Sequence, residues 1–296
     1  MKKIILGLSV IAAVAAVVVY GTGAFFSDTE TSTGNTFTAG AIDLKVDNTC
    51  YYNEIADGTP SCPMIRDEKG DIITTWKATD LGPMHKFFWF KDVKPGDFGE
   101  DTISLHVIDN DAWGRLVINK VGDYDNDCTE PEDNDSTDET CGSDINGEGE
   151  LRSNTNFMVW LDQGMIPGFQ NNDPENPGIY DEFEGDNIQQ EEYEPTLITP
   201  GTIDFPDGEV WYLAQGLQGA YYQYCYDEDV SSDGHNDYDL CHGLAEDGRM
   251  VGSVTYYFGV GWQVPYEVGN EVQTDSFGAD MTVEVQQYRN NPNPWE

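Results

Sequence analysis

The chain has 296 residues, of which 55 are acidic and 14 are lysine or arginine, for a formal net charge of −41 at pH 7. A charge this negative argues against nucleic acid as a partner, because phosphate backbones attract basic surfaces. It favours solubility and association with cations. We therefore expect either salty or Ca²⁺-rich surroundings, or acidic residues spread over surface loops where ordinary ionic screening suffices.

The first 24 residues have the pattern of a secretory signal peptide. Lys2 and Lys3 precede an uninterrupted run of apolar and small residues. Small residues at Ala24 and two positions before it predict cleavage between Ala24 and Phe25. The alternative is a retained membrane anchor, because about 18 apolar residues can just span a bilayer. We expect the mature chain to be secreted, and to lie in the extracellular matrix or at the cell surface.

The residues after the cleavage site resemble a known family. Phe26 to Thr31 has the sequence FSDTET, and GNTFTAG follows at 34–40. A second block, WQVP and GNEVQTDS, occupies 262–265 and 269–276, and the stretch 94–116 also looks like relatives of the same type. These blocks are similar to the TasA/camelysin (CalY) family of secreted biofilm-matrix proteins, which a SipW-type signal peptidase processes.

The resemblance implies a jelly-roll sandwich whose monomers polymerise by passing the mature N-terminal segment into the next subunit as a strand. An exposed strand edge offers unpaired backbone groups that such a segment can satisfy. We therefore expect residues 25–34 to be a donor segment, with two phenylalanines as apolar anchors and threonines that favour an extended backbone. The alternative is a disordered tail. The expected donor residues are Phe25, Phe26, Ser27, Asp28, Thr29 and Thr31.

Residues 35–296 are expected to form a single all-β domain, a jelly-roll-type β-sandwich with few short helices. Alternation of apolar and polar residues predicts half-buried strands, and a proline-glycine turn is predicted at 94–97. The absence of helical patterns between strands argues against an α/β fold. The expected strands lie at 35–46 with a break at Gly40, 87–90, 102–108, 113–121, 157–161, 210–213, 221–226, 254–264 and 279–285.

Long polar and acidic segments interrupt these strands. They contain too few apolar residues to bury a core of their own, so we expect surface loops. The predicted loop insertions cover about 48–82, 122–150, 162–195 and 227–241.

The six cysteines fall into three pairs that are close in the sequence. In an exported protein an even number of cysteines predicts disulfides, and each short loop closed in this way would stabilise the fold by roughly 3 kcal/mol. A zinc site is the competing interpretation, but no pair has the CxxC spacing. The expected disulfides are Cys50–Cys62, Cys128–Cys141 and Cys225–Cys241.

Two acidic stretches are candidate calcium sites. Asp123, Asp125 and Asp127 have the spacing that opens an EF-hand loop, but Cys128 stands where glycine is needed and Asn134 where a bidentate glutamate is needed. Calcium in some other geometry is the expected cofactor, and solvated acidic loops are the alternative. The second stretch contains Asp233, Asp237 and Asp239.

No motif predicts a catalytic residue. Camelysin-type relatives are classed as metallopeptidases, yet the four histidines form no HExxH motif and no GxSxG motif is present. The expectation is therefore a non-enzymatic structural subunit of extracellular biofilm-matrix or cell-surface fibres, which associates with itself and with matrix or surface components. The alternatives are a camelysin-type cell-surface metallopeptidase and a monomeric calcium-binding surface adhesion module.

Overall fold

The computed structural model describes most of the chain after the expected signal peptide. The described residues are 27–32, 37–38, 43–53, 61–62, 65–67, 70–90, 92–138, 140, 142, 145–170, 181–226 and 241–295. The predicted signal peptide, its cleavage site and Gly40 lie outside them. Within them, no helix combines the length and the apolar character that crossing a bilayer requires.

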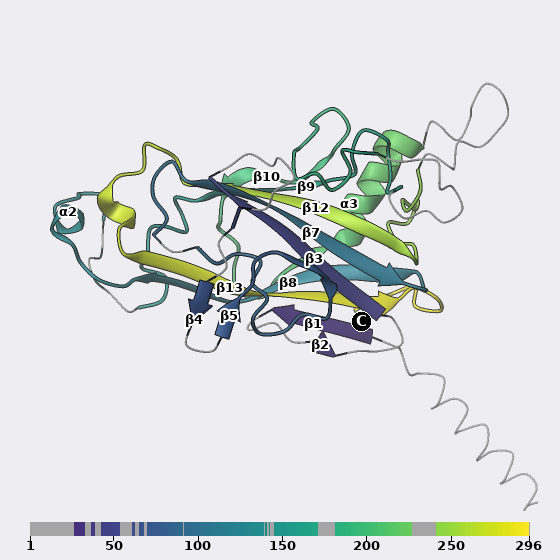
Figure 1. The fold of residues 1–296 in the computed structure, drawn as a ribbon, viewed down its shortest axis with the longest axis horizontal. Coiled ribbons are helices and arrows are strands. Elements are labelled where there is room, and N and C mark those ends of the chain that lie inside the picture. The colour runs from purple at the N-terminus through teal and green to yellow at the C-terminus, as the bar shows by residue number, and fades with distance from the viewer. Residues whose placement is uncertain are drawn as a thin grey trace, which may run out of the picture.

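The strands form two antiparallel sheets that pack face to face (Figure 1). We call them sheet A, with the order β11-β8-β13-β1-β2, and sheet B, with the order β10-β9-β12-β7-β3-β6. The strands of sheet A are β1 (Ser27–Ser32), β2 (Phe37–Thr38), β8 (Ala112–Asp125), β11 (Glu209–Tyr212) and β13 (Asp275–Gln287). Those of sheet B are β3 (Asp43–Tyr52), β6 (Trp76–Thr79), β7 (Phe98–Ile108), β9 (Asn156–Leu161), β10 (Thr196–Thr202) and β12 (Val254–Gln263).

The order of the strands is that of a jelly roll. Sheet A contains β11-β8-β13-β1 and sheet B contains β10-β9-β12-β7, so successive strands cross between the two sheets as in two interleaved Greek keys. The strands β2, β3 and β6 extend the outer edges, and β4 (Ile65–Asp67) with β5 (Gly70–Ile72) forms a separate two-stranded sheet. The predicted all-β, jelly-roll-type sandwich is therefore confirmed.

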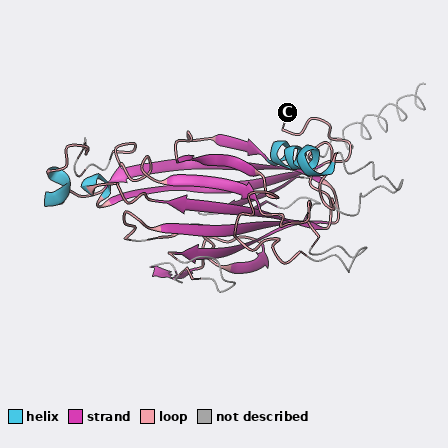
Figure 2. Cartoon of the chain, turned by 90° about the horizontal axis from the view of Figure 1, so that it is seen from above, coloured by secondary structure: helices cyan, strands magenta, loops and turns pink. Residues whose placement is uncertain are grey.

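The core lies between the sheets because each long strand alternates as predicted. Leu105 and Val107 of β7, Tyr256 of β12, and Val283 and Val285 of β13 are all buried in one cluster. The strands run along the long axis of the molecule, and the helices are confined to its two ends (Figure 2). These strands are long and continuous, so they hold the loops at their ends in fixed relative positions.

Part of the outer face of sheet B is also buried, which periodicity did not indicate. The hydroxyl of Thr102 on β7 donates to Asp162 Oδ2 (3.3 Å), and the backbone N–H of Asp162 extends the β9–β12 ladder by donating to the carbonyl of Tyr257 (3.0 Å). The acidic insertion that begins at Asp162 is therefore folded onto the sheet. Its described part runs over 162–170 and 181–194.

Three local predictions were wrong. The predicted strand 221–226 is the π-helical turn η1 (Tyr221–Cys225), which continues the helix α3 (Leu213–Ala220). Apolar residues at Leu213, Leu217 and Ala220 share one helical face, and burial of that face outweighs the β-propensity of the tyrosines.

The predicted strand 87–90 is irregular, and the rings of Phe87 and Phe90 pack against other aromatic rings. The predicted loop 48–82 contains the end of β3 and the short strands β4, β5 and β6. The other short helices in the described part of the chain are α2 (Glu130–Asp133) and η3 (Asn270–Val272).

Candidate functional site: the β1 edge and two carboxylate clusters

The predicted donor segment occupies an edge of its own sheet. β1 pairs antiparallel with β13 along its whole length, from Ser27 opposite Gln286 to Ser32 opposite Met281. Ser27, Asp28, Thr29 and Thr31 therefore lie in a strand of the same chain, and Phe25 and Phe26 lie outside the described residues. On its other side β1 pairs only with the two-residue strand β2.

On the side of β13 that faces away from β8, strand β1 pairs with six of its thirteen residues. The other neighbour of β13 is β8, and β1 is the only partner of β13 on the opposite side among the strands that the structure describes. If β1 left, the backbone from Met281 to Gln286 would become an open edge beside the buried side chains of Val283 and Val285. An open edge of this kind is a template for another extended chain.

A first carboxylate cluster lies where β8 ends and β13 begins. Among the described residues, Asp125, Glu132 and Asp275 form the group of histidine, cysteine, aspartate or glutamate side chains that could share a metal ion, and their ligand atoms lie within 4.8 Å of one another. Asp125 and Glu132 are each 1% exposed. The backbone N–H of Gly142 donates to Asp125 Oδ2 (2.6 Å).

Only one residue of the predicted calcium triple belongs to this cluster. Asp123 and Asp125 lie on one face of β8, but Asp123 pairs with Arg152 (3.4 Å) and Asp127 lies beyond the end of the strand. The backbone at Asp123 and Asp125 is a strand and not an EF-hand loop, and calcium binding by the three residues together stays a prediction. The second predicted stretch, with Asp233, Asp237 and Asp239, lies outside the described residues.

The surroundings of this cluster disfavour negative charge. Burial, and then the nearby carboxylates of Asp275, Asp138 and Asp125, raise the pKa of Glu150 to about 7. Burial and neighbouring carboxylates also raise the pKa of Asp275 to about 6, although two backbone N–H groups act against this rise. At neutral pH the cluster needs protons or a cation to balance its charge.

A second carboxylate cluster holds the folded insertion together. Asp162 and Glu194 are 0% and 1% exposed, and their carboxyl groups are hydrogen-bonded to each other. Backbone N–H groups of Gly185 and Asn187 donate to Asp162 (3.1 and 3.0 Å). Burial raises the pKa of both carboxyl groups, and proximity to Asp162 raises the pKa of Glu194 further. The pair therefore shares a proton at neutral pH, as two carboxyl groups in contact do.

Sequence reasoning did not find the two clusters. The members of each come from segments that are distant along the chain, and no short motif links them. Glu194 also lines an open pocket of ≈ 520 Å³ together with Met158, Gln189 and Tyr224. The only available signal was the abundance of carboxylates, which does not indicate which of them meet.

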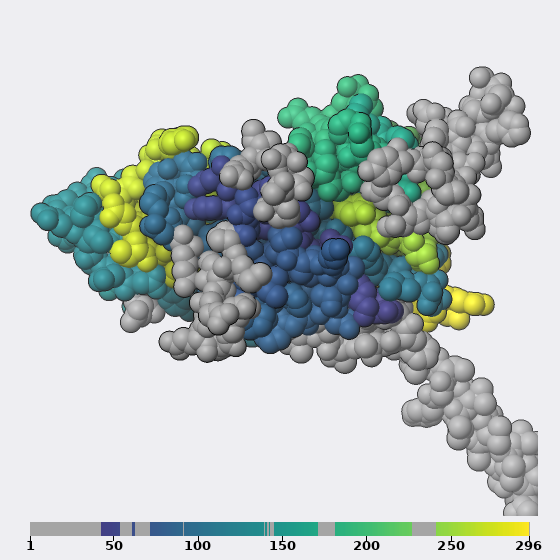
Figure 3. All heavy atoms as spheres, in the orientation of Figure 1, coloured from purple at the N-terminus to yellow at the C-terminus, as the bar shows by residue number. Residues whose placement is uncertain are grey.

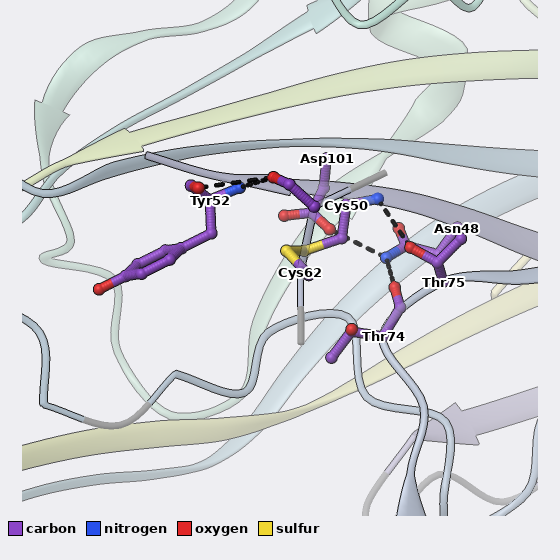
Figure 4. The surroundings of a disulfide bond; sticks show 8 residues. Asn48, Cys50, Tyr52, Cys62, Thr74, Thr75 and Asp101 are labelled. Carbon is purple, nitrogen blue, oxygen red and sulfur yellow. Dashed lines mark hydrogen bonds between the residues drawn. A yellow bond between two sulfur atoms is a disulfide. The ribbon is translucent and has the colours of Figure 1, made fainter. Parts of the chain in front are cut away.

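The structure contains the disulfides Cys50–Cys62 and Cys225–Cys241. Cys128 is also disulfide-bonded, and Cys141, its predicted partner, lies outside the described residues. Below the first disulfide, the side chain of Asn48 donates to the carbonyl of Thr74 (2.8 Å) and to Asp101 Oδ1 (2.9 Å) (Figure 4). The disulfide therefore lies next to the fully buried side chains of Asn48 and Asp101.

The three histidines that the structure describes take part in separate local contacts. His106 lies 2.6 Å from Asp47 and 2.9 Å from the Thr255 hydroxyl, and His85 accepts a hydrogen bond from the backbone of Gly82. None of them belongs to the metal-binding group named above.

Comparison with known proteins gives one match, confined to the N-terminal part. The family model described as camelysin metallo-endopeptidase matches residues 1–70. No curated protein and no solved structure matches the chain. The prediction that the chain is not an enzyme is contradicted, because the matching family is named for a metallo-endopeptidase. The chain is therefore similar to this family over its N-terminal 70 residues, and the match together with the disulfides suggests a secreted or surface protein.

Proposed function

We propose that this protein is a structural subunit of extracellular fibres and that it polymerises by exchange of its N-terminal strand. The observation that supports this proposal is the pairing of β1 with β13 over six consecutive residues, at the edge of sheet A and directly after the predicted cleavage site. A segment that fits this edge in its own chain has the same fit to the edge of an identical copy. Exchange of identical elements is an established route to assembly.

The mechanism begins with removal of the signal peptide. A SipW-type peptidase would cut between Ala24 and Phe25 and release the donor segment from the membrane. The segment would then leave its own β13 and pair with β13 of the next copy, so every backbone hydrogen bond lost within one chain is regained between chains. Because the donor and the acceptor edge belong to the same chain, repetition of this step gives an open, head-to-tail fibre.

Cross-linking between copies tests this exchange. Thr31 lies opposite Thr282 in the β1–β13 ladder, and directly opposite strand residues are close enough for a disulfide. One preparation carries Thr31→Cys and the other carries Thr282→Cys. We expect the mixture to form fibres in which the two different chains are joined by a new disulfide, detected on a non-reducing gel and by negative-stain electron microscopy.

The control pairs Thr31→Cys with Thr199→Cys, an exposed position on β10 of the other sheet, and should give no specific cross-link. A chain that carries both Thr31→Cys and Thr282→Cys should lock β1 in place and remain monomeric. Fibres that form equally well from the locked chain, or from a chain that lacks residues 25–33, would rule out strand exchange.

A second candidate function is metallo-endopeptidase activity at the cell surface, which the name of the matching family favours. Chelator-sensitive cleavage of casein by the purified mature chain would support it. Glu132→Gln should then abolish cleavage if the cluster of Asp125, Glu132 and Asp275 holds the required metal, and Asp133→Asn, an exposed neighbour on α2, should not. Cleavage that persists in chelator would exclude a metallopeptidase.

A further inference from the structure

Two acidic residues face each other across a buried part of sheet A. Asp125, the last residue of β8, is directly opposite Asp275, the first residue of β13. Side chains of directly opposite residues lie on the same face of a sheet, and like charges in such a pair destabilise it. Asp125 is 1% exposed, so water contributes little to screening this repulsion.

Glu132 of α2 adds a third carboxylate, and its second oxygen shares the Thr274 hydroxyl with another acceptor. Glu132 is 1% exposed, and its Oε2 accepts the backbone N–H of Thr129 (2.9 Å). The Thr274 hydroxyl lies 3.5 Å from Glu132 Oε1, but it also lies 2.8 Å from the carbonyl oxygen of Asp127. A hydroxyl can donate only one proton, and the shorter distance indicates that Thr274 donates it to Asp127.

Asp275 and a fourth carboxylate, Glu150, each have a buried oxygen that accepts no hydrogen bond. Asp275 Oδ2 accepts the backbone N–H groups of Glu150 (2.6 Å) and Leu151 (2.8 Å), whereas Asp275 Oδ1 and Glu150 Oε2 are buried and accept none. The charged groups that act on Glu132, Glu150 and Asp275 are other carboxylates. Arg152 forms its ion pairs with Asp123 (3.4 Å) and Asp204 (3.9 Å), which are not members of the cluster. The described basic side chains around the cluster therefore do not balance its negative charge.

We propose that this cluster is a calcium site, with Asp125, Glu132 and Asp275 as ligands. Glu150 is placed to supply a further oxygen. Calcium binds oxygen at 2.3–2.6 Å, so two oxygens on one ion lie at most about 5 Å apart. The observed ligand atoms, within 4.8 Å of one another, meet this condition. The donor set contains only oxygen, which favours Ca²⁺ over Zn²⁺, an ion that prefers nitrogen and sulfur.

The ion would join elements that are distant in sequence. Its ligands come from the end of β8, from α2 and from the start of β13, and α2 lies with η3 at one end of the long axis of the molecule (Figure 1). In the space-filling view the teal segment that contains α2 forms the narrow end of the molecule (Figure 3). Calcium at this point would fix the acidic segment after β8 against the sheet. The site does not depend on strand exchange, because β1 contributes no ligand.

Calorimetry on the chelator-treated mature chain tests the site. Titration with CaCl₂ in 0.5 M NaCl, roughly enough salt to screen diffuse binding, should saturate at one ion per chain. CaCl₂ should raise the thermal midpoint more than MgCl₂ at equal concentration. Glu132→Gln and Asp275→Asn keep an acceptor for the backbone N–H groups, and each should weaken calcium binding about tenfold or more.

The matched control is Asp133→Asn, an exposed residue of the same helix, which should bind calcium as the unmodified chain does. Circular dichroism would verify that each variant is folded, and Glu132→Gln provides a second measurement if Asp275→Asn does not fold. Non-saturating binding, or equal binding by all three variants, would overturn the proposal. So would a Glu132→Gln chain that is stabilised in chelator while calcium has no effect on the unmodified chain, because protons would then balance the cluster.

Discussion

Carboxylates act as backbone acceptors in the folded insertion on sheet B. Glu194 Oε1 accepts the N–H of Gly164 (2.7 Å), and its Oε2 accepts the N–H of Gln190 (2.8 Å). Asp162 accepts N–H groups from the same insertion in the same way. Side-chain oxygens thus satisfy buried donors that strands or helices would otherwise satisfy. As a consequence, the buried carboxyl groups of Asp162 and Glu194 retain a shared proton at neutral pH.

This proton makes stability depend on pH. Both carboxyl groups have pKa values in the folded chain above those of the unfolded chain, so the folded state holds more protons. The free energy of unfolding should therefore fall as pH rises from about 5, above the unfolded pKa values, through the higher folded ones. Urea unfolding at several pH values, in chelator, measures this slope.

Glu194→Gln should flatten the slope, because an amide keeps a donor toward Asp162 without titrating. The amide has one oxygen, so either Gly164 or Gln190 loses the acceptor of its N–H group, and the loss at pH 5 should be about 1–3 kcal/mol. The control is Glu191→Gln, an exposed position in the same insertion. An unchanged slope in Glu194→Gln would show that other groups cause the pH dependence.

Alanine substitutions at two glycines of β12 distinguish the effect of side-chain overlap on stability from the effect of the backbone. A side chain at Gly259 would overlap the indole ring of Trp160 on β9, whereas one at Gly261 would meet the flexible side chain of Met158 at 3.3 Å. Gly259→Ala should therefore lower the free energy of unfolding by about 1–3 kcal/mol or more, and Gly261→Ala should change it by less than about 1 kcal/mol. Equal effects in chemical unfolding would contradict the close packing of Trp160.

At the scale of elements, the two described disulfides attach irregular segments to regular ones. Cys225 ends η1, and its partner Cys241 lies beyond residues 227–240, whereas Cys50 is in β3. Both bonds close short loops, with sequence separations of 16 and 12. Their contribution is expected to be similar because loop-closure entropy varies slowly with length.

Replacing both cysteines of either pair with serine should lower the free energy of unfolding by about 3 kcal/mol. The double variants Cys225→Ser/Cys241→Ser and Cys50→Ser/Cys62→Ser can be compared by thermal and urea unfolding. Cys50 and Cys225 are both buried, so serine adds the cost of a buried hydroxyl in each pair. A loss of stability in only one of the two double variants would show that loop-closure entropy is not the main contribution of the disulfides.

At the scale of the whole molecule, the net charge of −41 opposes both folding and association of copies. Screening shortens the range of this repulsion from about 10 Å at 0.1 M salt to about 3 Å at 1 M. Carboxylate clusters buried in the fold are screened much less than charges in exposed loops. Added salt should therefore change stability and association mainly by screening the exposed charges.

Raising NaCl from 0.1 to 1 M should increase the thermal midpoint and speed the formation of fibres by the mature chain. Differential scanning calorimetry and light scattering measure the two effects. The locked chain with Thr31→Cys and Thr282→Cys should show the first effect and not the second. A midpoint that is independent of salt would indicate that the acidic residues are already neutralised by bound cations or protons.

Local patterns in the sequence determined the strands, the turn and the overall class of fold. The alternation in β7, β8, β12 and β13 has the period of a strand with one buried face, and this property is encoded residue by residue. The N-terminal block likewise indicated the family. Local patterns failed at 221–226, where burial of a helical face outweighed the β-propensity of the tyrosines.

Only the tertiary structure decided which distant residues meet. β1 pairs with β13 at the other end of the chain, Asp125 meets Asp275, and Asp162 meets Glu194. These contacts depend on the order and register of strands within the sheets, and every strand with alternating residues is compatible with many neighbours. The sequence determined that carboxylates are abundant. The sheet order determined which of them are brought together, and therefore where a proton or a cation is required.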